Sequence, residues 1–439
     1  MKILAVVAMS GAALALSGCP IAGGAKYTIG GTVTGLSGSG FALQLNGGDT
    51  LTFTGSGNFV FGTRLDNSAS YSVTVQTQPS NPSQTCAVRN GSGTIDKASV
   101  ANVIVSCTQV GRFAYIANRQ SNSISGFGID PRSGALVPLG GSPFAANGTT
   151  PTALAVDPNG QFLYVANSGS NNVSVYSIDA ATGGLTPLGL PIAAGSGPGA
   201  VTVDPTDHYL YVANLTSNDV SAFAISSGNL TPIVDSPFAA GAEPASLAID
   251  PNDNFLYATN FNDNTVSVFL IDLASGTLSP ISGSPFATGA GPLSIAIDPT
   301  DAFAFVANNS AQTIASYALN ATTGALTPSG SPLSAGTNAE AVAVDPTGSF
   351  VFAGNAQATN QVATFIITPA SGALTVSSTT TAGSLPIAVA IDPSGHFLYA
   401  VNFNSNDVSA YSLSATGALT PVAGSPFAVG SQPHAIAID

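Results

Sequence analysis

A repeat of about 47 residues constrains the fold of this chain more than any other sequence feature. Each copy contains a β-rich hexapeptide, such as FLYVAN, that ends in asparagine. This hexapeptide occurs seven times, ending at Asn118, Asn167, Asn214, Asn260, Asn308, Asn355 and Asn402. A complete copy adds an apolar run, an Asp-Pro turn, a second β-rich run and a segment like Leu-Thr-Pro. Short apolar runs separated by turn residues predict four strands in each copy.

The two ends of the repeat array show how it closes. The first copy begins at its hexapeptide, residues 113–118, and lacks the apolar run that precedes this segment elsewhere. The chain finishes with that missing element, the run HAIAID at residues 434–439. Pairing the last strand with the first unit completes seven four-stranded units. We therefore predict an all-β fold whose main part, residues 111–439, is a seven-bladed β-propeller. The alternative, an open solenoid, would leave both ends unpaired.

The N-terminus has the features of an export signal. Lys2 precedes an apolar run at residues 3–16, which is too short to span a bilayer. The following Leu-Ser-Gly-Cys string resembles the lipobox of bacterial lipoproteins, which implies cleavage after residue 18 and lipidation of Cys19. Pro20 in place of aspartate implies sorting to the outer membrane, on either its periplasmic or its outer face. Residues 19–26 would then form a lipidated tether; an ordinary signal peptide cut nearby is the alternative.

A separate small domain is expected between this tether and the repeats. Residues 27–110 contain short alternating segments typical of antiparallel strands, and they predict a β-sandwich. Cys86 and Cys107 are the two cysteines that remain after Cys19, and an even remainder in an exported chain indicates a disulfide. The segment resembles Ig-like or prealbumin-like modules. It would act as a spacer, with an adhesive role as the alternative.

Charge excludes some classes of partner. The formal net charge is −14, and no lysine or arginine follows Arg132. Nucleic-acid binding requires a basic surface, so we expect no nucleic-acid partner. Anionic lipid headgroups are excluded as a ligand of the repeats for the same reason.

The repeats resemble a known family. Units such as AIDPNDNFLYATNFNDNTVSVFLID, residues 248–272, are similar to YVTN-type repeats and to lactonase-like propellers related to 6-phosphogluconolactonase. The resemblance implies the propeller fold and suggests hydrolysis of a lactone. However, that family carries a string like Gly-Pro-Arg-His where the inner strands begin. Here residues 150–153, 197–200 and 432–435 contain no arginine, and a phosphorylated substrate would find few cations.

Aligning the starts of the inner strands predicts the ring of residues around one mouth of the central channel. The ring comprises Thr152, Gly199, Ala245, Leu293, Glu340, Ile387 and His434. Pairing of the last strand with the first blade would bring Arg119 beside His434. A histidine with a carboxylate activates water, and an arginine stabilises an oxyanion, so we predict Arg119, Glu340 and His434 as catalytic candidates. The alternative is a solvated rim without a chemical role.

The loops after the hexapeptides are rich in asparagine and aspartate. Their oxygen atoms suit sugar hydroxyls or Ca²⁺, so Asn167, Asn214, Asn260 and Asn402 are candidate ligand-binding residues. The alternative is that these residues only shape turns. The aspartates of the repeated Asp-Pro turns are likewise expected to have a structural role, which is to cap these turns. The phenylalanines of a recurring Ser-Pro-Phe motif are expected to pack between blades, and His208 and His396 to lie in surface turns.

The function predicted from these features is a lipid-anchored binding or scaffold protein of the cell envelope. It would present one propeller face to a neutral ligand, a glycan or another envelope protein, as a monomer and without a cofactor. The alternative is a lactonase-like hydrolase that opens an uncharged lactone with Arg119, Glu340 and His434. A third and weaker hypothesis is a calcium-dependent surface module.

Overall fold

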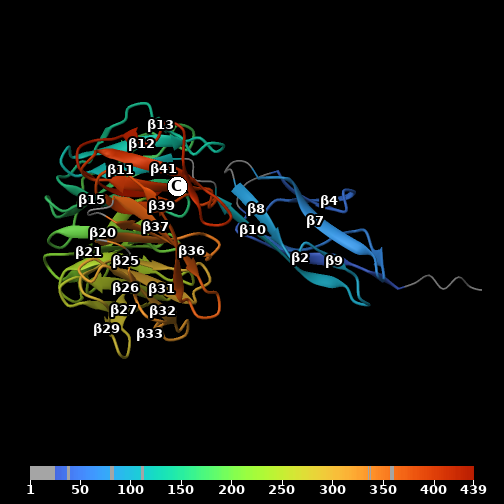
Figure 1. The fold of residues 1–439 in the computed structure, drawn as a ribbon. Coiled ribbons are helices and arrows are strands. Elements are labelled where there is room, and N and C mark those ends of the chain that lie inside the picture. The colour runs from blue at the N-terminus through green and yellow to red at the C-terminus, as the bar shows by residue number, and fades with distance from the viewer. Residues whose placement is uncertain are drawn as a thin grey trace, which may run out of the picture. The chain divides into compact units, whose positions relative to one another are not determined.

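The computed structural model describes residues 25–36, 40–79, 84–109, 113–334, 336, 338–355 and 360–439. The predicted signal peptide, Cys19 and most of the tether lie outside these residues. All regular structure in the described ranges is β-strand. A search of these residues found no helix long and apolar enough to cross a membrane. The chain divides into two compact units, Met1–Thr108 and Gln109–Asp439 (Figure 1).

The first unit is built from two four-stranded sheets and a two-stranded ribbon. One sheet has the order β5-β2-β10-β8, the other β4-β3-β7-β9, and β1 pairs with β6. The strands are β1 (Lys26–Tyr27), β2 (Ile29–Thr34), β3 (Phe41–Leu45), β4 (Asp49–Phe53), β5 (Gly57–Val60), β6 (Leu65–Asp66), β7 (Ser70–Thr77), β8 (Gln84–Arg89), β9 (Ser92–Thr94) and β10 (Val100–Gln109).

One hydrophobic core holds this unit together, with residues such as Ile29, Phe41 and Val103 fully buried. The predicted disulfide is confirmed: Cys86 of β8 is bonded to Cys107 of β10, with 3.9 Å between the Cα atoms. The expectation of purely antiparallel strands is wrong at one point, because β2 and β10 pair in parallel. These are nearly the first and last strands of the unit, and a long intervening chain allows the crossover that parallel pairing requires.

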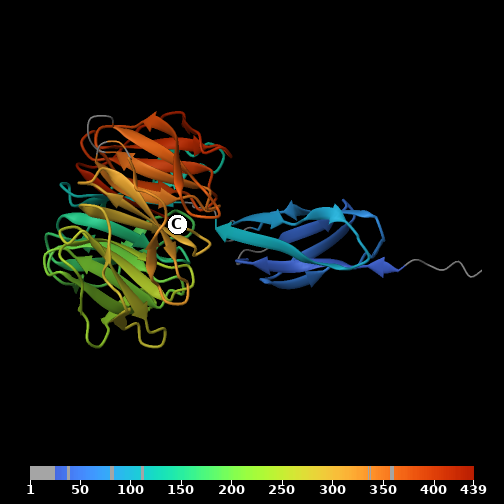
Figure 2. The same cartoon turned by 60° about the horizontal axis from the view of Figure 1, so that its bottom comes forward.

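The second unit contains seven sheets that follow one another in chain order around a ring (Figures 1 and 2). Each has four strands in line. The innermost are β44 (Pro433–Ile438), β15 (Pro151–Val156), β20 (Pro198–Val203), β25 (Pro244–Ile249), β30 (Pro292–Ile297), β35 (Ala339–Val344) and β39 (Pro386–Ile391). The second strands are β11 (Phe113–Asn118), β16 (Phe162–Asn167), β21 (Tyr209–Asn214), β26 (Phe255–Asn260), β31 (Phe303–Asn308), β36 (Phe350–Asn355) and β40 (Phe397–Asn402).

The outer strands complete the sheets. The third strands are β12 (Ser123–Ile129), β17 (Asn172–Ile178), β22 (Asp219–Ser226), β27 (Thr265–Ile271), β32 (Thr313–Leu319), β37 (Gln361–Ile367) and β41 (Asp407–Leu413). The fourth are β13 (Leu136–Pro138), β18 (Leu185–Pro187), β23 (Asn229–Pro232), β28 (Leu278–Pro280), β33 (Leu326–Pro328), β38 (Leu374–Thr381) and β42 (Leu419–Pro421). Two-residue strands also pair with most third strands: β14 (Phe144–Ala145), β19 (Ile192–Ala193), β24 (Phe238–Ala239), β29 (Phe286–Ala287), β34 (Leu333–Ser334) and β43 (Phe427–Ala428).

Closure of the ring occurs as predicted. The C-terminal β44 pairs antiparallel with β11 of the first blade, with Ile436 opposite Ile116. The innermost strands also contact one another in a closed cycle, in which β44 touches both β39 and β15. The ring therefore has seven complete blades, in each of which the second strand is paired with an innermost strand.

Buried tyrosines link neighbouring blades. Tyr115 of the first blade donates its hydroxyl hydrogen bond to the carbonyl of Gly183 in the second, at 2.8 Å. Tyr399 of the last blade makes the same bond to Gly134 of the first, at 2.9 Å. Both side chains are fully buried, so these bonds satisfy hydroxyls that would otherwise cost about 1–3 kcal/mol each. The aromatic rings themselves fill the space between the sheets.

Candidate functional site

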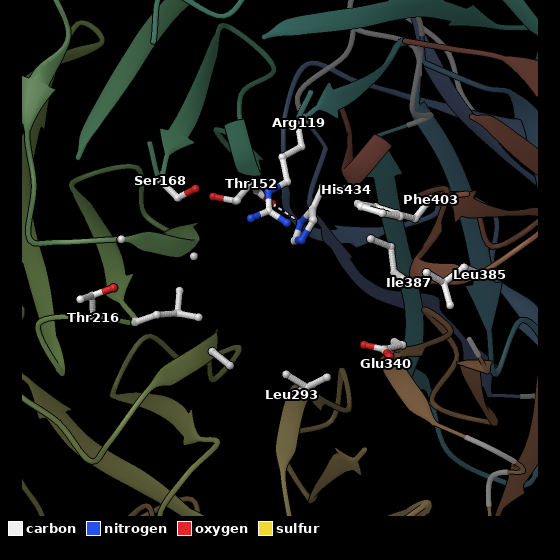
Figure 3. Close-up of a pocket in the computed structure, with 14 residues that line it drawn as sticks. Arg119, Thr152, Ser168, Thr216, Leu293, Glu340, Leu385, Ile387, Phe403 and His434 are labelled. Atoms are coloured by element: carbon white, nitrogen blue, oxygen red, sulfur yellow. Dashed lines mark hydrogen bonds between the residues drawn. The ribbon is translucent and has the colours of Figure 1, made fainter. Parts of the chain in front are cut away.

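A β-bulge at the start of each innermost strand shapes the site. The pairing of β15 with β16 skips Thr152, and the equivalent ladders skip Gly199, Ala245, Leu293, Glu340, Ile387 and His434. These are the residues predicted from the sequence to ring the channel mouth. A bulge leaves one residue out of the ladder and re-aims its side chain. All seven line a single cavity of about 670 Å³, together with Arg119 and residues of the surrounding loops (Figure 3).

His434 is held in one orientation by the backbone of the neighbouring blade. Its Nδ1 lies 2.8 Å from the carbonyl oxygen of Thr152. A carbonyl only accepts, so the proton of the neutral ring sits on Nδ1, and Nε2 is left with its lone pair. Phe403 packs edge-on against the ring, with 6.3 Å between the centroids. Burial lowers the pKa of His434 from its ordinary 6.5, and the nearby Arg119 charge lowers it further, against an opposing effect of the Thr152 bond.

Arg119, the residue directly after β11, lies beside His434 (Figure 3). Its backbone N–H donates to the carbonyl of Gln432 at 2.9 Å, which ties it to the loop before β44. No carboxylate of the described residues lies within ion-pair distance of its guanidinium. A cation without a counter-ion in a cavity wall is suited to an anion or a developing oxyanion.

Glu340 lines the same cavity, but its hydrogen-bond partner is Asn309 rather than His434 or Arg119. Its Oε1 accepts a hydrogen bond from the Asn309 amide at 2.9 Å. Burial raises the pKa of Glu340 above its ordinary 4.5, and the Asn309 bond partly offsets that rise. In Figure 3, Ile387 lies between Glu340 and His434, because β39 separates β35 from β44. The orienting partner of His434 is thus a carbonyl, and the histidine–carboxylate arrangement suggested by the sequence is not formed by a direct hydrogen bond.

The four asparagines predicted to bind ligand have a structural role instead. Asn167, Asn214, Asn260 and Asn402 are each 0% exposed, so their side chains cannot reach a ligand. Each Nδ2 donates to the side chains five and seven residues later: in the case of Asn214, Asp219 at 2.7 Å and Ser221 at 2.9 Å. The other three repeat this geometry. The ligand-binding interpretation is therefore wrong, and the alternative of turn formation is right.

The other repeated motifs have the structural roles expected of them. Asp204 accepts two backbone N–H bonds, from His208 at 2.7 Å and Tyr209 at 2.5 Å, and the remaining Asp-Pro aspartates cap their turns in the same way. The Ser-Pro-Phe phenylalanines pack against the hydrophobic cores of the blades. His208 and His396 are exposed in turns.

Metal ligands do not gather in the described part of the chain: no three histidine, cysteine, aspartate or glutamate side chains there could share an ion. The hypothesis of a calcium-dependent module therefore gains no support from these residues.

Sequence reasoning missed the loop residues that complete the cavity. Leu215, Phe403, Ser168 and Arg119 each directly follow the asparagine of a hexapeptide, and all four line the cavity. Only Arg119 was singled out from the sequence, because it is charged. Leu215, Phe403 and Ser168 could have been identified from the sequence by their position directly after a repeated asparagine.

A closed seven-bladed propeller with a ligand-sized cavity at one mouth defines the class of protein. A family model described as "Lactonase, 7-bladed beta-propeller" matches residues 70–197, 190–340 and 333–435. The chain therefore belongs to the seven-bladed β-propeller lactonase family, as the resemblance of its repeats implied. Among curated proteins no sequence relative was found.

Solved structures share the propeller. A Bacteroides uniformis protein, provisionally described as a 6-phosphogluconolactonase, is 21% identical with a TM-score of 0.67, covering 75% of this chain and 100% of its own. A similarly described protein from Bacteroides fragilis is 21% identical with a TM-score of 0.67, covering 74% and 97%. The periplasmic gluconolactonase of Pseudomonas aeruginosa is 20% identical with a TM-score of 0.66, covering 74% and 98%. At these identities the likeness shows the fold.

Family membership changes the balance between the two functional hypotheses. It favours the lactonase-like hydrolase, which was the alternative in the sequence analysis, over the binding or scaffold module.

Proposed function

We propose that this protein hydrolyses an uncharged lactone in the cavity at the channel mouth. The observation that carries the proposal is His434: its Nδ1–H donates to the Thr152 carbonyl, and Nε2 is a base beside the Arg119 guanidinium, which has no ion pair among the described residues. Membership of the lactonase family supports the same reaction class. The substrate is taken as uncharged because Arg119 is the one cation that lines this cavity among the described residues.

The reaction follows from the placement of these groups. Nε2 of His434 takes a proton from water as the water oxygen attacks the lactone carbonyl carbon. Arg119 stabilises the negative charge that develops on the carbonyl oxygen. The ring C–O bond then breaks, and the imidazolium returns its proton to the leaving alkoxide. The product is a hydroxy acid, which ionises near neutral pH and releases one proton per turnover.

Glu340 takes no part in proton transfer in this scheme. Its carboxyl group accepts a hydrogen bond from Asn309, and Ile387 lies between it and His434.

Proton release gives a direct test of the proposed function. We expect the purified protein to consume base in a pH-stat assay with a panel of five- and six-membered uncharged lactones, at rates proportional to protein concentration. Heat-unfolded protein is the control for spontaneous hydrolysis. Turnover no faster than that control across the whole panel would contradict the proposal, and would direct the search to binding of a glycan or an envelope protein.

We also propose that the protein is exported and anchored by a lipid on Cys19, an inference that rests on the N-terminal sequence alone. In a bacterial host given an alkyne-labelled fatty acid, the wild-type chain should carry the label and sediment with membranes. Cys19→Ala should lose both properties. A control chain that begins at residue 20 behind an ordinary signal peptide should be exported without label. Equal labelling of wild type and Cys19→Ala would refute the anchor.

A further inference from the structure

The wall of the cavity is unequally divided between polar and apolar groups. Arg119 and His434 lie on one side (Figure 3). Leu215 and Leu293 line another part of the same cavity, and each keeps part of its side chain exposed, whereas Glu340 separates Leu293 from Ile387. Apolar side chains left partly open in a concave site gain free energy when an apolar ligand group covers them.

Few of the polar groups nearby can serve a ligand hydroxyl. Thr152 is buried, and its hydroxyl already donates to the carbonyl of Pro198 at 2.7 Å. Gly199 and Ala245 have no polar side-chain atoms. A ligand hydroxyl placed against Leu215 or Leu293, out of reach of the Glu340 carboxyl group, would be left unpaired, which costs roughly 5- to 150-fold in affinity.

Size and charge restrict the ligand further. A volume of about 670 Å³ lies within the range that holds drug-sized ligands, so a lactone ring beside His434 leaves room for a substituent. Among the described residues the cavity wall supplies one cation, Arg119, which the ester group occupies in the proposed reaction. A charged substituent would therefore be buried against apolar carbon without a partner.

We propose that the cavity selects lactones with an uncharged alkyl or aryl substituent, bound with the ester group at Arg119 and His434 and the substituent against Leu215 and Leu293. This inference rests on the proposed lactone hydrolysis for the position of the ring. It separates the protein from enzymes that act on polyhydroxylated sugar lactones.

The test compares γ-lactones that differ only in chain length, with glucono-δ-lactone as the polyhydroxylated probe. We expect kcat/KM to rise up to about 4-fold for each CH₂ group that the wall covers, and to be lowest for glucono-δ-lactone. In Leu293→Gln, which places an amide on the wall, the gain in kcat/KM with chain length should shrink. Leu190→Gln is the matched control, since Leu190 is 93% exposed and does not line the cavity.

A binding measurement distinguishes failure of this inference from failure of the proposed function. If no lactone is hydrolysed, the reaction is refuted, and alkyl-substituted cyclopentanones, which cannot be hydrolysed, are then titrated by calorimetry. Affinity that rises with chain length in the wild type and less in Leu293→Gln upholds the apolar wall. Equal values for short and long chains in both the kinetic and the binding series, or a preference for glucono-δ-lactone, would overturn the inference.

Discussion

Replacing His434 with alanine is expected to lower kcat/KM for lactone hydrolysis by about 10²- to 10⁴-fold, the usual contribution of a general base. The reason lies in the geometry of its two ring nitrogens. Nδ1 is held by the Thr152 carbonyl at 2.8 Å, so Nε2 has a fixed direction and carries the lone pair of the neutral ring. Alanine removes the base and leaves Arg119 in place, so residual activity should come from oxyanion stabilisation and binding alone.

The pH profile adds a readout that a loss of folding would not produce. Burial and the Arg119 charge lower the pKa of His434 below 6.5, so the neutral base predominates at neutral pH. Wild-type kcat/KM should therefore rise with pH through a pKa below 6.5 and stay level above it, and this rise should be absent from the residual rate of His434→Ala. His208→Ala is the matched control, because His208 is exposed in a turn and lies outside the cavity. Loss of activity in both variants, or in neither, would contradict the assignment.

Replacing Asp253 with asparagine is expected to stabilise the propeller at pH 7.5 by up to about 3 kcal/mol. Asp204 and Asp253 come from the turns of adjacent blades and are 0% and 4% exposed. The Thr206 hydroxyl lies between them, within hydrogen-bond distance of both carboxylates. Oδ1 of Asp253 is buried without a described partner. Desolvation, followed by the Asp204 charge, raises the pKa of Asp253 to about 6.

The direction of the pH dependence follows from this raised pKa. Between the unfolded value of about 3.9 and the folded value of about 6, the folded state binds more protons than the unfolded state. The contribution of Asp253 to the free energy of unfolding is therefore greatest at low pH and is lost as pH rises through about 6. Asparagine keeps the shape of the side chain and removes the charge.

Urea unfolding of the wild type and Asp253→Asn at pH 4.5 and 7.5 measures this effect. The variant should exceed the wild type mainly at the higher pH. Asp235→Asn is the matched control: Asp235 is exposed, and it has a positive φ that asparagine tolerates. A gain for Asp253→Asn that is equal at both pH values would show that the buried charge is not its cause.

The sequence alone determined the fold of the propeller, because the fold is periodic. Seven copies of one hexapeptide imply seven blades, and the unmatched strand at residues 434–439 implies pairing with the first blade. Alignment of the copies also identified the ring around the mouth, since equivalent positions in equivalent blades lie at equal depth. Glu340 and His434 were found in this way, as the ionisable residues of an otherwise uncharged ring, and Arg119 was found from the pairing of the last strand with the first blade.

Tertiary structure decided what the side chains at those positions contact. Asn214 looked like a ligand-binding residue because its type is polar, yet the side chain is buried and its Nδ2 donates to Asp219 and Ser221 inside the blade. His434 is oriented by the Thr152 carbonyl, a backbone group that no side-chain pattern reveals. Ile387 of the intervening blade separates Glu340 from His434, so the histidine–carboxylate pair suggested by the sequence does not form. Periodicity fixes positions along a strand, whereas hydrogen-bond partners depend on distances between strands that only the folded chain defines.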